Sequence, residues 1–191
     1  QRLQSEFGAK LLSIWPFGPQ VMFCRKPISS LRDIEGFKVR IAGPSLESLV
    51  TSLNAIPVSI AYDDVLESLR IGLIDCAVTS SASANFSGWP KYTTHFYPIT
   101  LTLGLNGHVI RLATWNRLSP GQQKVLLRAF EQNAEAIWSY AEAIHSASAA
   151  CNTGAECNLG VSYKLTHVVP SMDDLQFLQE TMKHTGFEKW S

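Results

Sequence analysis

Three side chains suited to holding an organic anion stand near the ends of successive apolar runs. Arg40 lies near the end of the run 37–41, and Tyr62 and Thr79 follow the next two runs. An arginine inside an apolar strand is costly to bury unless its charge is paired, and its planar guanidinium suits bidentate contact with a carboxylate. Together these residues predict an anion site.

Each of the three residues also has a structural explanation. Lys38 and Arg40 can both face solvent on the outer side of their strand. Tyr62 can pack as an aromatic residue at the entrance of a helix, and Thr79 can cap the helix that follows. Spacing alone does not decide between these explanations and the anion site.

Residues 34–80 form the framework that must bring these side chains together. The apolar runs are 37–41, 56–60 and 74–78, and the helix-like segments between them are 45–54 and 63–71. Strands that alternate with helices of this length predict a βαβαβ unit with a parallel sheet. Ligands bind outside the carboxyl ends of parallel strands, so the three side chains are expected to face one crevice.

The rest of the chain shows further strand and helix signals. Strand-like runs are 9–15, 20–24, 95–103, 108–115 and 161–169, and helices are expected at 1–8, from 119 over about 25 residues, and at 170–183. Residues 16–19 predict a loop. Asn106 and Gly107 favour a hairpin, although a crossing between domains stays open. Residues 79–92 predict a loop, or a short helix followed by a bend.

Composition and motifs argue against several classes of protein. Sixteen basic residues balance sixteen acidic ones, which gives no electrostatic reason to expect nucleic acid or an anionic membrane as partner. There is no P-loop, dinucleotide fingerprint, zinc-protease motif or nucleophile elbow, and the five histidines are far apart. We therefore expect neither an enzyme nor a protein with a metal or other cofactor.

Four cysteines are present. Cys151 and Cys157 flank a turn-rich spacer, so they can form a local disulfide, which would suit an exported protein, or remain two thiols near a helix end. Cys24 and Cys76 lie in apolar runs and are expected to be buried, unpaired small hydrophobic residues. The first residues lack the apolar core of a signal peptide, so a processed or truncated chain is expected.

Three segments in order resemble one family. They are RKPISSLRDIEGFKVRIAG, LNAIPVSIAYDDVLESLRIGLIDCAV and TWNRLSPGQQKVL, and the match covers roughly residues 14–130. They are similar to the solute-binding proteins of tripartite ATP-independent periplasmic (TRAP) transporters, the DctP family. The order of the three segments is specific, whereas no single one would be.

The resemblance implies an α/β, two-lobed periplasmic binding protein fold that closes on an organic anion. It places 27–96 in ligand-binding lobe two, and 1–26 and 97–191 in the hinge strands, the long helix and the C-terminal elements of lobe one. Family members carry a further N-terminal segment. We therefore expect exposed sheet edge and apolar surface that need this segment, a partner chain or a homodimer to cover them.

The resemblance also assigns roles to site residues. It implies that Arg40 pairs with the substrate carboxylate and that Tyr62 is the aromatic residue before the second helix. Thr79 stands where the family has an asparagine, and Gln20 stands where many members have a second basic residue. The first departure weakens one expected polar contact. The second leaves one strong cation, which favours a ligand with a single carboxylate or an otherwise less charged ligand.

Two further aromatic residues, Phe86 and Trp89, are expected to cover the apolar part of such a ligand. The function implied is periplasmic capture of a small organic acid and its delivery to the TRAP membrane permease. The alternative is a sensory or scaffold domain that retains the fold without transport. Sequence favours neither a particular acid nor an oligomeric state.

Overall fold

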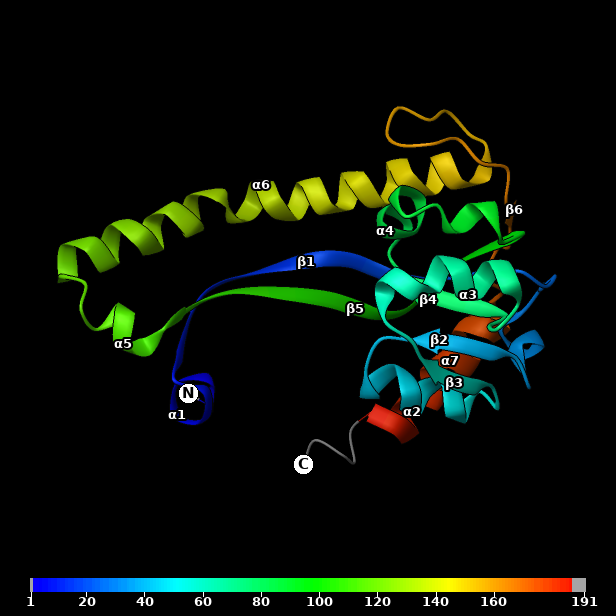
Figure 1. The fold of residues 1–191 in the computed structure, drawn as a ribbon, viewed down its shortest axis with the longest axis horizontal. Coiled ribbons are helices and arrows are strands. Elements are labelled where there is room, and N and C mark those ends of the chain that lie inside the picture. The colour runs from blue at the N-terminus through cyan, green and yellow to red at the C-terminus, as the bar shows by residue number, and fades with distance from the viewer. Residues whose placement is uncertain (1, 187–191) are drawn as a thin grey trace. The chain divides into compact units, whose positions relative to one another are not determined.

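The computed structural model describes residues 2–186 and is built around one mixed sheet (Figure 1). The strand order is β3-β2-β4-β1-β5-β6. The strands are β1 (Ala9–Cys24), β2 (Lys38–Ile41), β3 (Ile56–Ser59), β4 (Cys76–Thr79), β5 (His95–Arg111) and β6 (Thr166–His167). Strand β2 is parallel to both β3 and β4, whereas β1 is antiparallel to β4.

Helices surround this sheet and give the predicted α/β class. They are α1 (Arg2–Phe7), α2 (Pro44–Ser52), α3 (Val65–Ile71), α4 (Ser81–Phe86), α5 (Leu112–Trp115), α6 (Pro120–Thr153) and α7 (Met172–Gly186). Short 3-10 turns are η1 (Leu31–Ile34), η2 (Tyr62–Asp64) and η3 (Trp89–Lys91). None of the helices that the model describes is long and apolar enough to cross a membrane.

The predicted βαβαβ unit is confirmed as β2-α2-β3-α3-β4. Helix α2 begins with Pro44 at its first position, where no backbone N–H is needed, and it buries Leu46, Leu49 and Val50. Helix α3 ends at Gly72, whose φ of 76° is the left-handed conformation that commonly closes a helix. Local signals therefore set both helix boundaries.

The chain divides into two compact units. The first comprises Gln1–Gly18 and Leu103–Ala143, and the second comprises Pro19–Thr102 and Ile144–Ser191. All of 27–96 lies in the second unit, so the three candidate side chains belong to a single unit. The assignment of 27–96 alone to lobe two stays a prediction.

The sheet of the second unit carries a hydrophobic core on each face. On one face, Met22 and Val39 of the sheet lie in a cluster with Leu49 of α2 and Leu178 of α7. On the other face, Phe23 lies in a cluster with Leu69 of α3, Ala84 of α4 and Trp89. Adjacent strand residues enter opposite clusters because side chains alternate across a strand.

Two predicted strand breaks are wrong. Strand β1 runs through 16–19 and β5 runs through 104–107 without interruption. Strand β5 passes from one unit to the other, which confirms the crossing that the sequence left open as the alternative to a hairpin. Pro16 and Pro19 precede Val21, the first β1 residue in register with β4, so their missing N–H groups cost no bond on that side. Asn106 lacks the positive φ that an Asn-Gly hairpin turn needs.

The predicted strand at 161–169 is also largely wrong, since only β6 forms there. The Tyr163 amide donates to Cys151 O at 2.7 Å, and the Leu165 amide donates to Asn152 O at 3.0 Å. These hydrogen bonds join the segment to the end of α6 instead of to a neighbouring strand.

The cysteines form two disulfides. Cys151 is joined to Cys157, and Cys24 is joined to Cys76. The expectation that Cys24 and Cys76 are buried is confirmed, but the expectation that they are unpaired is wrong. The register of β1 with β4 sets these two residues directly opposite each other.

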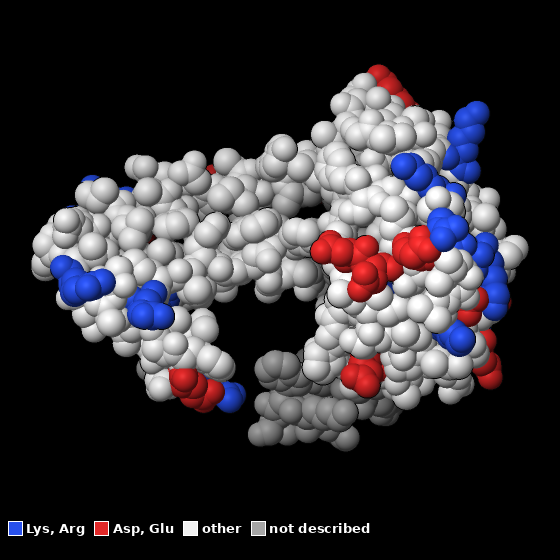
Figure 2. All heavy atoms as spheres, in the orientation of Figure 1, with Lys and Arg blue, Asp and Glu red and all other residues white. Residues whose placement is uncertain are grey.

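The first unit keeps apolar surface on one side of its strands. The His108 ring lies 6.1 Å from the Trp15 ring and 5.0 Å from the Phe130 ring of α6. Leu103 and Leu105 lie on the side of β5 opposite His108, because side chains alternate along a strand, and both remain about 60% exposed. On the face of the molecule shown in Figure 2, acidic and basic side chains lie interspersed, in keeping with the balanced charge.

Candidate functional site

Arg40 is a buried cation in the middle of the parallel strands. Its neighbours Val39 and Ile41 enter the core beneath α2 and α7, so Arg40 faces the α3 and α4 side. It is 5% exposed, whereas Lys38 is exposed. The solvent-facing explanation is therefore wrong for Arg40. Its neighbour across β4 is Ala77, whose small side chain leaves room for the guanidinium.

The guanidinium reaches the carboxyl ends of the neighbouring strands. Arg40 Nε donates to Ile60 O at 3.1 Å, and Nη1 donates to Val78 O at 3.3 Å. No acidic side chain within the described residues forms an ion pair with it. Since a guanidinium has five N–H groups, most of its donor capacity is available to a bound acceptor.

Two aromatic rings flank this charge. The guanidinium carbon lies 5.9 Å from the ring centroids of both Tyr62 and Trp89. Burial lowers the pKa of Arg40 from its ordinary value, and the nearby Tyr62 opposes that shift. Arginine remains protonated at neutral pH because its ordinary pKa is so high. The rings stabilise a cation that has no acidic partner among the described residues.

Tyr62 is held by helix α4 through its hydroxyl group. The Tyr62 hydroxyl donates to Ser83 O at 2.8 Å and lies 2.8 Å from Ser87 Oγ. Because its single proton is used on Ser83, Ser87 is the donor in the second bond. The Tyr62 ring lies 5.5 Å from the Trp89 ring and is 37% exposed. Tyr62 therefore lies at the surface over Arg40.

Thr79 ends β4 on the same face of the sheet as Arg40. Its neighbour Val78 enters the core beneath α2 and α7, which leaves Thr79 on the α4 side, where it is buried. The helix cap is the next residue, Ser80, whose Oγ accepts from the Ser83 amide at 3.2 Å. The explanation of Thr79 as the helix cap is therefore wrong.

The remaining predicted site residues lie in different surroundings. Trp89 is fully buried, meets Phe23 edge-on at 6.4 Å, and has an indole N–H without a partner among the described residues. Phe86 is 61% exposed, and its ring lies beside Gly160. Gln20 is half-buried on β1, where alternation with Val21 puts it on the face opposite Arg40. Trp89 thus joins Arg40, whereas Phe86 and Gln20 lie elsewhere.

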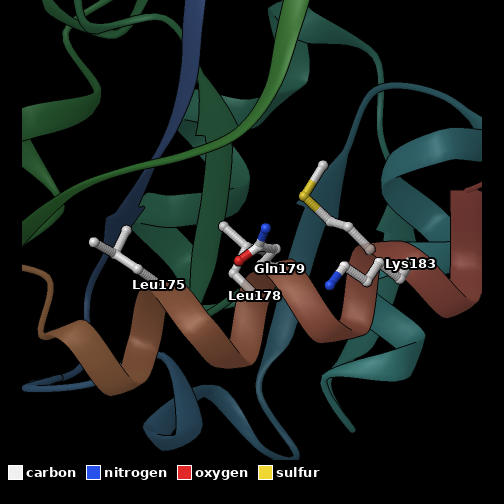
Figure 3. Close-up of a pocket in the computed structure, with 5 residues that line it drawn as sticks. Leu175, Leu178, Gln179 and Lys183 are labelled. Carbon is white, nitrogen blue, oxygen red and sulfur yellow. The ribbon is translucent and has the colours of Figure 1, made fainter.

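A separate hollow of about 350 Å³ lies along one side of α7 (Figure 3). Leu175, Leu178 and Met182 give it an apolar lining, with Gln179 and Lys183 beside them. Leu178 belongs to the core on the face away from Arg40, so this hollow is a different surface. In the described part of the chain, no three histidine, cysteine or acidic side chains are grouped to hold a metal ion.

A match to a family model shows which protein family this chain belongs to. The model for bacterial extracellular solute-binding proteins of family 7, DctP, matches residues 1–156. The chain belongs to this family. DctP proteins are extracytoplasmic receptors that bind solutes, and the solved relatives are two-lobed TRAP periplasmic solute-binding proteins.

Individual relatives are distant in sequence but similar in fold. A solute-binding protein of Roseobacter denitrificans is 26% identical over 133 residues, which cover 68% of this chain and 40% of that protein. A TRAP periplasmic solute-binding protein from Sulfitobacter sp. NAS-14.1, with bound β-D-galacturonate, has a TM-score of 0.81 at 18% identity. One from Desulfovibrio desulfuricans, with bound sn-glycerol-3-phosphate, has a TM-score of 0.87 at 17% identity.

These alignments confirm the expected fold class. They cover 99% of this chain in both structures, but 60% of the Sulfitobacter chain and 58% of the Desulfovibrio chain. The chain thus spans about three fifths of the length of these solved DctP proteins, and a smaller share of the Roseobacter protein.

Sequence reasoning missed the residues that hold Arg40 and Tyr62 in place. Ser83 and Ser87 anchor Tyr62, and the carbonyl groups of Ile60 and Val78 anchor Arg40. Ser83 contributes its backbone carbonyl and Ser87 its hydroxyl group, so only the Ser87 contact depends on residue type. The carbonyl groups carry no signal in residue type.

Proposed function

We propose that this chain is the binding part of a periplasmic TRAP solute-binding protein that captures a small organic acid through Arg40. The acid's carboxylate pairs with the guanidinium, and the loaded protein delivers it to the membrane permease. The role proposed is binding, not catalysis. The observation that carries the proposal is a buried arginine with no acidic partner among the described residues.

The energetics of burial support this assignment. An uncompensated buried charge is unfavourable, so a protein retains one where a ligand completes it. The guanidinium already donates to Ile60 O and Val78 O, which fixes its plane before any ligand arrives. A carboxylate then meets a prearranged donor, and less side-chain entropy is lost on binding.

Several solved relatives hold carboxylic acids, which supports a small organic acid as the ligand. The Sulfitobacter protein holds β-D-galacturonate, and other solved relatives hold L-malate and pyroglutamic acid. Each is a small acid with at least one carboxylate. We propose a ligand with one carboxylate, because the single guanidinium of Arg40 can hold one such group through two hydrogen bonds.

Ligand identification tests the proposal. The purified protein is examined by native mass spectrometry for a co-purified acid, and its thermal unfolding is followed with β-D-galacturonate, L-malate and pyroglutamate. A bound acid, or a rise in melting temperature with one acid that Arg40→Met abolishes, supports capture through Arg40. Absence of any bound acid and of any shift across a wide carboxylate panel would favour the sensory or scaffold alternative.

A further inference from the structure

Two buried side-chain amides join helix α4 to the end of helix α6. Asn85 of α4 and Asn152 of α6 are each at most 1% exposed. Asn85 Nδ2 donates to Asn152 Oδ1 and to Val161 O, both at 2.8 Å, and Asn85 Oδ1 accepts from the Val161 amide at 3.0 Å. Asn152 Nδ2 donates to Ser81 O at 3.1 Å. We refer to Asn85, Asn152 and the backbone of Val161 as the amide cluster.

The amide cluster is attached to a constrained segment. The disulfide between Cys151 and Cys157 closes the turn that follows α6, directly beside Asn152. Gly160 has a φ of +88°, and a Cβ at this position would overlap Asn85 Oδ1. Residue 160 must therefore be glycine for both backbone conformation and close approach. The side of the cluster away from α4 has little freedom to move.

Helix α4 depends on such an anchor. It has six residues, far fewer than an isolated helix needs for stability in water. Asn85 fixes the side of the helix that faces α6, whereas Ser83 and Ser87, spaced one turn apart, lie on the opposite side. These two serines are the partners of the Tyr62 hydroxyl. The amide cluster and Tyr62 therefore hold opposite sides of one short helix.

We infer that Asn85 and Asn152 are positioning residues for the anion site. They hold α4 in the place from which Ser83 and Ser87 keep Tyr62 over the Arg40 guanidinium. The inference rests on the proposed function, because the position of Tyr62 matters for affinity only if Arg40 receives a ligand. The amides touch neither Arg40 nor Tyr62, and they act through the helix.

A double-mutant cycle tests this action through Tyr62. The affinity for β-D-galacturonate or L-malate, whichever the wild type binds, is measured for Asn85→Leu, for Tyr62→Phe and for the double variant. Asn85→Leu is expected to weaken binding about tenfold in the wild-type background and less than about twofold in the Tyr62→Phe background. Equal losses in both backgrounds would overturn the inference.

A second measurement needs no acid. Hydrogen exchange of backbone amides is followed in wild type and in Asn85→Leu, with attention to the Ser87 amide bonded to Ser83 O and the Asp64 amide bonded to Ala61 O. Faster exchange at both, with β2 unchanged, is expected. Faster exchange at Ser87 alone would show that α4 loosens without releasing Tyr62, which contradicts the inference.

Two further variants separate positioning from general loss of stability. Gly160→Ala displaces Asn85 without removing either amide, and it replaces Asn85→Leu in these experiments if Asn85→Leu fails to fold. It should then give the same pattern of affinity and exchange as that expected for Asn85→Leu. Asp174→Asn removes a buried carboxylate that serves η1 and α7 on the other face of the sheet, and it should leave affinity unchanged. If wild type binds no acid in the panel, the proposed function fails and the exchange experiment alone decides the positioning role.

Discussion

Replacement of Arg40 by methionine is the perturbation that bears most directly on the site. The change removes the cation but keeps an unbranched side chain of similar length beside Tyr62 and Trp89. Removal of one partner from a desolvated, hydrogen-bonded charge pair costs about 2–5 kcal/mol of binding free energy. At 1.4 kcal/mol for each factor of ten, the dissociation constant should rise by about 30- to 4000-fold.

Arg40→Lys separates charge from geometry. Lysine keeps the positive charge, but its ammonium is a single point and cannot reach Ile60 O and Val78 O while gripping both oxygens of a carboxylate. The loss of one charge-assisted hydrogen bond, worth about 1.5–3 kcal/mol, with the positive charge retained, predicts an affinity between those of wild type and Arg40→Met.

Isothermal titration calorimetry with the acid that binds wild type measures all three proteins, and a denaturant titration without acid checks their folding. Arg40→Met should unfold at a similar denaturant concentration, because relief of the buried charge opposes the loss of its two carbonyl bonds. The matched control is Arg32→Met, which removes an arginine stacked on Phe177 at 3.9 Å. Binding by Arg40→Met within twofold of wild type would refute the assignment of Arg40.

Three further predictions concern stability. Asp174 accepts hydrogen bonds from the Leu31 and Ser171 amides, and these bonds outweigh burial and lower the pKa of Asp174. Its contribution to the free energy of unfolding is therefore present above about pH 4 and lost as the pH falls through the folded pKa. Asp174→Asn should reduce the loss of stability at acid pH in denaturant titrations. Burial lowers the pKa of His145, so stability should decline as pH falls below about 6.5, and His145→Gln should remove that slope. Loss of the Cys24–Cys76 disulfide, with a sequence separation of 52, should reduce the free energy of unfolding by about 4 kcal/mol, and loss of Cys151–Cys157, with a separation of six, by about 2 kcal/mol. Equal losses would contradict the loop-entropy argument.

The framework of the site was predictable because local patterns determine it. Apolar runs and helix signals between 34 and 80 gave the βαβαβ unit, and Gly72 marked the end of α3. An arginine inside an apolar run indicated a functional cation, but Lys38 and Arg40 lie on the same face of β2. Arg40 is buried because Tyr62 and Trp89 lie beside it, and sequence alone could not show which residues pack over each position of the strand.

The errors arose where distant pairing outweighs local signals. The proline residues before Val21 suggested a loop, yet that part of β1 lies outside the register with β4, where a missing N–H costs nothing. The pairing of Cys24 with Cys76 depends on the same register across 52 residues. No local pattern reports which strands become neighbours, so neither result could follow from composition or spacing.

The segment 79–92 shows the same limit beside Arg40. Its small polar residues fit a loop or a short helix equally well, and residue type drew attention to Phe86, which lies beside Gly160. Once α4 is known to span Ser81–Phe86, the helical period places the Ser87 hydroxyl toward Tyr62 and the Asn85 side chain toward α6. The position of a residue on the helix therefore decides whether it can support the proposed anion site. Residue type identified Arg40 as a candidate, but only the fold shows which neighbours surround its guanidinium.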